Sequence, residues 1–409
     1  MKCGLLGRKL GHSYSPQIHA FLGEYPYTLF EKEPEDIENF LTSGDFTAIN
    51  VTIPYKKVVI PYCSTLTDCA RRMNAVNTII RQSDGSLLGH NTDYFGFTSM
   101  VHHSGLNPNG KKAIVLGSGG ASNTAVIALE DMGAEVIVIS HKENTTENLL
   151  QYKDAKVIVN ATPVGMYPNN GNTPVNLDLF PQLEGVLDMI YNPARTKLLL
   201  DAEKRGLIAE NGLWMLVAQA KEAAEWFLNQ PLSDTLIKEI HQALTCEMEN
   251  ITLIGMPGCG KTHIGRILAQ RLGKEFVDVD KYIEDMAGIS IPQIFSESGE
   301  EVFRRLETEA LDQLGKCSGL VIATGGGCVT RSINYPLLHQ NSKIVWIQRE
   351  IESLATDGRP LSQSGQLQAM YEVRSPLYEA FSDHIISNNA TPNDAAELII
   401  IAMHKEAIT

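Results

Sequence analysis

The chain has 409 residues, of which 43% are hydrophobic and 20% are charged, and its formal net charge is −14. This length predicts two or three domains, and the composition is typical of a globular protein. The 48 acidic residues against 34 basic ones argue against nucleic acid as the main partner, because a phosphate backbone is bound by basic surface. No leader-like start and no apolar stretch of about 18 residues is present, so we expect a cytoplasmic protein without a membrane span.

Short apolar runs alternate with helical patterns along the whole chain, which is typical of βαβ units and of parallel sheets covered on both faces. The runs expected to be strands are 111–116, 135–139, 156–159, 186–190, 250–254, 320–323 and 343–347. The helical patterns that matter below are 122–132, 233–249 and 263–272. A polar segment, C-E-M-E-N, ends the second of these helices and predicts the main domain boundary near 246–250.

Four polar clusters lie in loops of the first 95 residues. They read G-H-S-Y-S-P (11–16), N-V-T-I-P-Y-K (50–56), N-A-V-N-T (74–78) and G-H-N-T-D (89–93). Ser15 before Pro16 also fits the cap and first position of a helix. Taken alone, Lys56 would be an ordinary surface lysine and Asp93 a helix cap, so a functional role for either depends on the clusters being read together.

A glycine-rich turn, A-I-V-L-G-S-G-G-A-S (113–122), lies between a predicted strand and a predicted helix. That context is typical of a dinucleotide-binding turn, whose backbone N–H groups meet a pyrophosphate. The cofactor contacts expected here are Gly117, Ser118, Gly119, Gly120 and Ala121. The end of the next strand reads Ser140-His141-Lys142, and the first acid is Glu143. Because an acid at that strand end selects NAD and basic residues favour the 2′-phosphate, we expect NADP(H).

Together with N-A-T-P-V-G-M (160–166), D-M-I-Y-N-P (188–193) and N-G-L-W-M-L-V-A-Q-A (211–220), these segments resemble shikimate dehydrogenase over residues 1 to about 245. The resemblance implies reduction of 3-dehydroshikimate to shikimate, with Lys56 and Asp93 as the catalytic pair. The substrate contacts that it implies are Ser13, Ser15, Thr52, Asn77, Tyr191 and Gln219. The further cofactor contacts that it implies are Ser140, His141, Lys142, Asn160, Thr162 and Gly212. A lysine beside an aspartate suits this chemistry, because hydride addition to a ketone leaves an alkoxide that must take a proton.

The strongest motif of the chain is G-M-P-G-C-G-K-T (255–262), which fits G-x-x-x-x-G-K-[ST] between a predicted strand and a predicted helix. Its backbone N–H groups and the helix N-terminus form an anion site. Lys261 is expected to reach the β- and γ-phosphates of ATP, and Thr262 to hold Mg²⁺. The ATP contacts expected here are Gly258, Cys259, Gly260, Lys261, Thr262 and His263.

Five further motifs follow in order: F-V-D-V-D (276–280), G-E-x-x-F-R-x-x-E (299–307), A-T-G-G-G (323–327), R-P-L (359–361) and R-S-P-L-Y (374–378). We expect the first to be a short strand that ends in two carboxylates. With the phosphate-binding turn, these motifs resemble shikimate kinase over residues 250–409.

The kinase resemblance implies that Asp280 contacts the shikimate hydroxyls and acts as base. It implies that Asp278 positions Mg²⁺ together with Thr262, and that Arg359, from a lid segment, stabilises the transferring phosphoryl group. The other substrate contacts that it implies are Arg304, Gly325, Gly326, Gly327 and Arg374. Arginine suits a carboxylate site because its planar guanidinium binds both oxygens. Taken alone, however, Arg304 would also fit a solvated helix arginine paired with Glu301 or Glu307.

We therefore expect an α/β chain with two enzymatic domains, at 1–246 and 250–409. The first would combine a substrate lobe (1–95 and about 216–246) with a Rossmann NADP-binding lobe (96–215), and the second would be a P-loop domain with a parallel sheet. The predicted function is a bifunctional enzyme that makes shikimate with NADPH and phosphorylates it with ATP and Mg²⁺. The sequence does not decide between a monomer and a homodimer.

Three alternatives remain open from the residues. The first half could be an NAD-preferring quinate/shikimate dehydrogenase. The second half could be a nucleotide-binding regulatory module, because its lid segment is short and lacks a second arginine before Arg359. A P-loop NTPase acting on macromolecules is disfavoured by the acidic charge.

Overall fold

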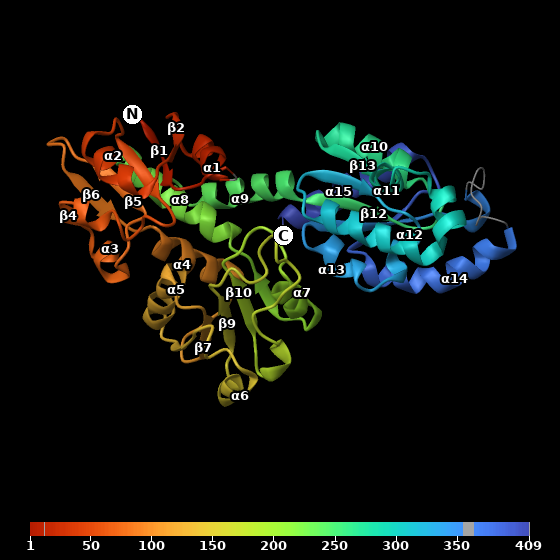
Figure 1. The fold of residues 1–409 in the computed structure, drawn as a ribbon, viewed down its shortest axis with the longest axis horizontal. Helices are drawn as coiled ribbons and strands as arrows, with labels where there is room; N and C mark the ends of the chain where they lie inside the picture. The colour runs from red at the N-terminus through yellow and green to blue at the C-terminus, as the bar shows by residue number, and fades with distance from the viewer. Residues whose placement is uncertain (12, 355–363, 409) are drawn as a thin grey trace. The chain divides into compact units, whose positions relative to one another are not determined.

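The computed structural model describes residues 1–11, 13–354 and 364–408, and divides into two compact units, Met1–Ala243 and Leu244–Thr409. Three sheets organise them, two in the first unit and one in the second (Figure 1). Within the described ranges, no helix combines the length and the apolar character needed to cross a membrane. The mixed α/β architecture that the sequence predicts is confirmed.

The first sheet has the strand order β2-β1-β3-β5-β6-β4 and contains both parallel and antiparallel pairs. Its strands are β1 (Cys3–Gly7), β2 (Tyr27–Glu31), β3 (Ala48–Val51), β4 (Thr65–Leu66), β5 (Thr78–Arg81) and β6 (Leu87–His90). Strand β1 is parallel to β2 and β3, whereas β5 runs antiparallel to β3 and β6. The parallel rhythm predicted for the whole chain is therefore wrong here, because the tight turn after β5, with Gly85 at φ 84°, returns the chain as a hairpin.

The second sheet is wholly parallel, in the order β11-β10-β9-β7-β8. Its strands are β7 (Lys112–Leu116), β8 (Glu135–Ile139), β9 (Val157–Asn160), β10 (Gly185–Asp188) and β11 (Ile208–Glu210). The helices that accompany it are α4 (Asp93–Ser104), α5 (Gly120–Asp131) and α7 (Lys197–Lys204). After β11 the chain forms α8 (Leu213–Leu228), which packs on α4. It also packs on α1 (Ser15–Leu22), a helix that lies against strand β2 of the first sheet.

The third sheet, in the second unit, is also parallel, with the order β13-β14-β12-β15-β16. Its strands are β12 (Asn250–Ile254), β13 (Glu275–Asp278), β14 (Leu320–Ala323), β15 (Ser342–Gln348) and β16 (His384–Ser387). The helices around it include α10 (Lys261–Leu272), α11 (Val279–Ala287), α12 (Ile291–Gly315), α14 (Ser364–Phe381) and α15 (Pro392–Ile408). Every residue of β12 is buried, as expected of a central strand covered on both faces.

Six of the seven predicted strands lie within a residue of their expected ends, and the strand predicted at 186–190 is shifted to Gly185–Asp188. The strand predicted at 276–280 needs a correction, because β13 ends at Asp278. The side chain of Asp278 accepts a hydrogen bond from the backbone N–H of Asp280, 3.1 Å away, and so caps α11. Asp280 consequently lies in the first helical turn instead of at the end of the strand.

Helix α9 (Thr235–Met248) is the element that leads from the first unit into the second, and it corresponds to the helix predicted at 233–249. Its C-terminal carbonyl groups are bound by one lysine. The ammonium of Lys274 donates to the carbonyl oxygens of Cys246, Glu247 and Glu249 at 2.8, 3.0 and 2.8 Å. A helix leaves its last carbonyls without partners in the helix, and a cation there is favourable.

We predict that Lys274→Met lowers the free energy of unfolding of the second unit by about 1–3 kcal/mol, because three carbonyls lose a charged donor. Thermal or urea unfolding of the full chain, followed through the P-loop unit, measures this change. The matched control is Lys281→Met, which removes only an exposed ion pair with Asp285 and should change stability by less than about 0.5 kcal/mol. An equal loss in both variants would contradict the capping role.

Candidate active sites

One edge of the first sheet gathers three of the predicted residues. Asn50 at the end of β3 pairs with Thr78 at the start of β5, and Thr78 pairs with His90 at the end of β6. Lys56 follows β3, Asn77 precedes β5 and Asp93 follows β6. The strand register therefore places these three side chains at the same edge, although they are up to 37 positions apart in the sequence.

Lys56, Asn77 and Asp93 form one hydrogen-bonded group. The ammonium of Lys56 donates to Oδ2 of Asp93 at 2.6 Å, and Nδ2 of Asn77 donates to Oδ1 at 2.9 Å. The N-cap of α4 is Thr92 and Asp93 is the first helical residue, so the predicted cap at Asp93 is wrong, and its carboxylate binds Lys56 and Asn77. The Lys56 side chain keeps 31% of its surface exposed. An ammonium that is held at one side and open at the other can deliver a proton to a bound molecule.

Ser13 and Thr52 follow β1 and β3, two adjacent parallel strands, and therefore lie at the same edge. The hydroxyl of Ser13 accepts a hydrogen bond from the backbone N–H of Ser15 at 3.2 Å. The cap predicted for Ser15 is wrong, because the N-cap of α1 is Tyr14 and Ser15 already lies inside the helix. Ser15 is nearly buried, with 9% of its surface exposed.

Tyr191 and Gln219 come to this region from distant elements. Tyr191, after β10, packs edge-on against Tyr14, with ring centroids 6.1 Å apart, and burial raises its pKa. Gln219, on α8, accepts a hydrogen bond from the hydroxyl of Thr92 at 3.3 Å. Thr92 in turn exchanges hydrogen bonds with Asn77. Gln219 is thus connected through Thr92 to the Lys56 group.

The glycine turn between β7 and α5 presents open backbone. Gly117 has φ 109°, and a Cβ there would lie 3.1 Å from the carbonyl oxygen of Ala161. Gly119 and Gly120 face open space, and together with Ser118 and Ala121 they are exposed. Gly119 is the N-cap of α5, so the exposed N–H groups and the helix N-terminus face the same side. This arrangement suits a bound pyrophosphate.

Beyond β8, the predicted cofactor residues Ser140, His141 and Lys142 lie in a turn. Ser140 donates from its backbone N–H and its hydroxyl to one oxygen of Glu143, at 3.0 and 2.6 Å, which lowers the pKa of that carboxyl. His141 and Lys142 are exposed. The carboxylate of Glu143, the first acid of this segment, therefore accepts the hydrogen bond of the backbone N–H at the strand end.

Asn160, Thr162 and Gly212 shape the opposite side of this cofactor region. Asn160 is fully buried. Its Nδ2 donates a hydrogen bond to Oδ1 of Asp188 at 3.0 Å, and its Oδ1 accepts one from the hydroxyl of Thr162 at 2.7 Å. Its side chain therefore orders the turn, and a cofactor would meet the backbone of this segment. Gly212 is the N-cap of α8, and a Cβ there would lie 2.3 Å from the carbonyl oxygen of Met189, which only glycine permits.

The P-loop of the second unit has three glycines in the left-handed region, Gly255, Gly258 and Gly260, with φ 141°, 83° and 103°. Lys261 opens α10, and its ammonium bonds the carbonyl oxygens of Gly255 and Met256 at 2.8 and 3.0 Å. Cys259 is fully buried, so its side chain packs inside the loop and contributes backbone only.

A cavity of about 890 Å³ extends from this loop, with His263 and Thr262 in its lining. The hydroxyl of Thr262 donates to Oδ2 of Asp278 at 2.9 Å, so the two oxygen atoms predicted to hold Mg²⁺ lie side by side. Asp280, Arg304, Arg374 and the three glycines 325–327 line the same cavity. Residue Arg359 lies outside the described residues.

The two predicted arginines point to the glycine segment 325–327. A Cβ on Gly327 would lie 2.3 Å from the guanidinium of Arg304, and one on Gly325 would lie 2.9 Å from Oδ1 of Asp280. Arg374 donates to the carbonyl oxygen of Gly326 at 3.1 Å. Glycine at positions 325 and 327 therefore allows the side chains of Asp280 and Arg304 to approach the backbone closely.

Arg304 is not a solvated helix arginine, since only 8% of its surface is exposed. It binds Glu307 at 2.9 Å and Glu300 at 3.1 Å, whereas Glu301 pairs with Arg331. Glu307 is fully buried, its pKa is raised by that burial, and its second oxygen has no hydrogen-bond partner. Glu307 is not among the site residues predicted from the sequence, although its position three residues after Arg304 in the motif is the spacing of neighbours on a helix.

The two sites define a dehydrogenase with a substrate sheet and a dinucleotide-binding lobe, followed by a P-loop phosphotransferase unit. The family model of the shikimate dehydrogenase substrate binding domain matches residues 5–79, and the shikimate kinase model matches residues 257–404.

Relatives and solved structures agree with the match to the shikimate dehydrogenase family model. The chain is 34% identical to the shikimate dehydrogenase (NADP(+)) of Clostridium beijerinckii, over 60% of this chain and 98% of that protein. Shikimate dehydrogenase 1 from Peptoclostridium difficile is 35% identical over 60% of this chain and 98% of its own, with a TM-score of 0.55. A shikimate 5-dehydrogenase from Thermus thermophilus, solved with NADP(H) and shikimate, is 29% identical over 59% of this chain and 99% of its own, with a TM-score of 0.54. The chain belongs to the shikimate dehydrogenase family and continues into a shikimate kinase domain.

Glu210, two residues before Gly212, gives a pH-dependent prediction. Burial raises its pKa from 4.5 to about 7. The stability that the protonated form provides is complete below about pH 4.5 and is lost as the pH rises through 7. We expect Glu210→Gln to stabilise the first unit by about 1–3 kcal/mol at pH 8 and to change little near pH 4. Thermal unfolding between pH 4 and 8 measures this, with exposed Glu130→Gln as the control. A gain that is independent of pH would contradict it.

Proposed function

We propose that this chain catalyses two consecutive reactions, the NADPH-dependent reduction of 3-dehydroshikimate and the ATP-dependent phosphorylation of shikimate. The observation that carries the proposal is that one chain holds both a proton-delivering pair and a P-loop cavity lined by substrate-binding candidates. Lys56 and Asp93 form a proton-delivering pair, and the P-loop shares its cavity with Asp280 and Arg304. The product of the first reaction is the substrate of the second.

The residues of the first unit fit NADPH. The open backbone at Gly119 and Gly120 would hold the pyrophosphate, and Gly117 lets the chain turn there. Lys142 and His141 would face the 2′-phosphate. When bound, NADPH supplies a hydride to the carbonyl carbon of the substrate.

In the reduction, Lys56 donates a proton to the carbonyl oxygen, which becomes the hydroxyl oxygen of shikimate. Asp93 holds the ammonium at 2.6 Å, and Asn77 fixes the orientation of that carboxylate. Hydrogen bonds from Ser13, Thr52 and Gln219 would orient the substrate hydroxyls and carboxylate. The arrangement supplies the proton at one defined atom, which is the contribution of general acid catalysis.

The residues of the second unit fit ATP with Mg²⁺. Thr262 and Asp278 are adjacent oxygen ligands, and Mg²⁺ commonly takes one or two such ligands together with water and phosphate oxygens. Within the described ranges no cluster of three or more His, Cys, Asp or Glu side chains is suited to hold a metal ion.

In the phosphorylation, Asp280 accepts the proton of the shikimate hydroxyl that attacks the γ-phosphorus. Lys261 leaves its carbonyl partners to bind the β- and γ-phosphates. Arg304 and Arg374 hold the shikimate carboxylate, and we assign the remaining charge stabilisation to Arg359. Phosphoryl transfer depends mainly on such positioning and charge compensation.

We predict separable lesions. Lys56→Ala should reduce 3-dehydroshikimate reduction by about 10²–10⁴-fold and leave shikimate phosphorylation unchanged, whereas Lys261→Ala should do the reverse. Both rates are measured on each purified full-length variant, and Lys57→Ala, which alters the exposed neighbour of Lys56, is the matched control. If either active-site change silenced both reactions in a folded chain, two independent sites would be excluded.

The complete proposal is tested by incubating the purified chain with 3-dehydroshikimate, NADPH and ATP. The expected product is shikimate 3-phosphate, and its absence would overturn the proposal. Replacing NADPH by NADH tests the NAD-preferring alternative, and formation of shikimate without shikimate 3-phosphate in the presence of ATP would indicate that the second unit is only a regulatory module. A cytoplasmic location and an exclusively small-molecule set of partners stay predictions.

Glu143 gives a prediction on cofactor choice. Its carboxylate occupies the N–H group and the hydroxyl of Ser140, where the 2′-phosphate is expected, and like charges repel. We expect Glu143→Gln to lower KM for NADPH by about 2–10-fold and to leave KM for NADH unchanged. Steady-state kinetics with both cofactors measures this. The control Glu147→Gln removes a charge from the following helix, α6 (Thr146–Leu149), and an equal effect there would point to net charge alone.

A further inference from the structure

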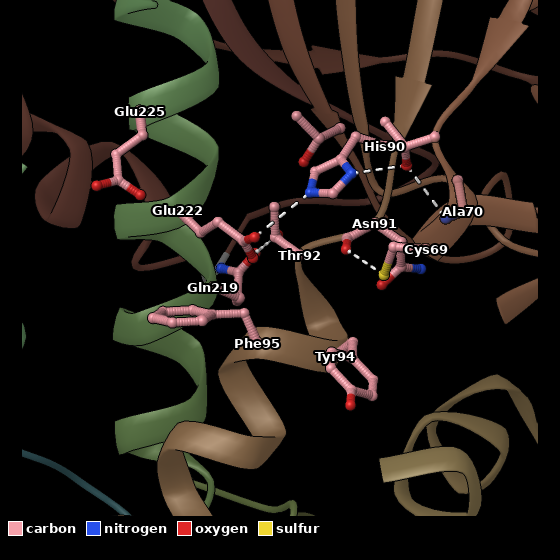
Figure 2. A network of polar contacts seen from close by, with 12 residues as sticks. Cys69, Ala70, His90, Asn91, Thr92, Tyr94, Phe95, Gln219, Glu222 and Glu225 are labelled. Carbon is pink, nitrogen blue, oxygen red and sulfur yellow. Dashed lines mark hydrogen bonds and ion pairs between the residues drawn. The ribbon is translucent and has the colours of Figure 1, made fainter. Parts of the chain in front are cut away.

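His90 joins two elements of the first unit, the end of β6 and helix α8 (Figure 2). It ends β6 and is nearly buried, with 6% of its surface exposed. Its Nδ1 lies 2.8 Å from the hydroxyl of Thr67, the N-cap of α3 (Asp68–Met73), and its Nε2 lies 3.5 Å from Oε1 of Glu222 on α8. The ring also packs on Trp226, with centroids 4.5 Å apart.

The contacts of the two ring nitrogens fit one tautomer of His90. The Thr67 oxygen accepts from the backbone N–H of Ala70 at 3.2 Å, and its hydroxyl hydrogen can be donated to Nδ1. We assign the ring hydrogen of neutral His90 to Nε2, where it donates to Glu222. This assignment satisfies both ring nitrogens.

Glu222 is a buried acid that the proposed reaction does not use. Burial raises its pKa, and its hydrogen bond to His90 acts in the opposite direction. Its Oε2 has no hydrogen-bond partner. Glu225, one turn further along α8, points away from His90 in Figure 2 and pairs with Lys221 at 2.7 Å. An incompletely satisfied buried carboxyl calls for an explanation other than stability.

Both members of the pair are three residues from a predicted active-site residue. Glu222 follows Gln219 by three positions, so both lie on the same face of α8. His90 precedes Asp93 by three positions, along the tight connection from β6 to α4. Between them, Thr92 bonds Gln219 at 3.3 Å and Asn77 at 3.0 Å. The His90–Glu222 and Thr92–Gln219 contacts therefore both join the β6–α4 connection to α8.

We propose that His90 and Glu222 are positioning residues of the dehydrogenase, which hold α8 against the β6–α4 connection so that Gln219 and the Lys56–Asp93 pair meet the same substrate. This role rests on the proposed dehydrogenase function. In this role the pair needs no contact with substrate or cofactor, because it acts by fixing the distance between two elements that each contribute a substrate contact.

The test compares Glu222→Leu with Glu222→Gln in the full chain. The leucine variant should raise KM for 3-dehydroshikimate about tenfold, with KM for NADPH and both kinase constants of the same chain unchanged. The glutamine variant keeps an oxygen that can accept from Nε2 of His90 and should restore most of the affinity. The control Glu239→Gln, at an exposed glutamate of α9, should be silent. His90→Phe keeps the ring on Trp226 but removes both nitrogen contacts, so it should match Glu222→Leu.

An unchanged KM for 3-dehydroshikimate in Glu222→Leu and His90→Phe would overturn the inference. An equal rise of KM for NADPH, or a glutamine variant as impaired as leucine, would also overturn it. Hydrogen exchange separates this result from failure of the proposed function. Faster exchange at 90–97 and 213–222 in Glu222→Leu, with α10 unchanged, is expected even if the wild-type chain reduced no 3-dehydroshikimate, and unchanged exchange in those segments would refute the positioning role.

Discussion

The shared edge of neighbouring strands is the constraint on which both sites depend. In a parallel sheet every strand ends on the same side, so residues that follow different strands meet there without any sequence proximity. The first sheet departs from this rule through a hairpin, yet the antiparallel β5 starts where its neighbours end. Lys56 and Asp93 are brought together in this way, and Thr262 and Asp278 meet at the corresponding edge of the third sheet. Helices begin at these edges and add their partial positive charge.

The charge of the chain opposes its proposed ligands, which are all anions. The structure resolves this conflict locally, by binding each important cation to a partner before any ligand arrives. Lys56 is paired with Asp93, Arg304 with Glu307, and Lys261 with carbonyl oxygens of its own loop. The carboxylates cancel much of the charge of Lys56 and Arg304, so these side chains would bind an anion through oriented hydrogen bonds, whereas Lys261 and the loop N–H groups keep their positive charge. The net charge of −14 therefore describes the background and not the sites.

Much of both sites follows from local patterns. The strand at 250–254, the phosphate-binding turn and the helix that follows are specified by adjacent residues, and the structure has all three. Predictions from local patterns were wrong at two element boundaries, where more than one residue could begin the helix. Ser15 could cap a helix, but Tyr14 occupies that position. The strand predicted through residue 280 stops at Asp278, because that side chain starts α11.

The sequence by itself determined most strands of the second and third sheets, the glycine turns and the identity of the charged groups, because these depend on periodicity and on residues a few positions apart, whereas the strands of the first sheet were not predicted. Only the tertiary structure decided which charges are partners. Arg304 pairs with Glu300 and a fully buried Glu307, and not with Glu301. His90 meets Glu222 across 132 positions. Pairings of this kind depend on strand register and on helix packing, which follow from burying the whole core and not from any single segment.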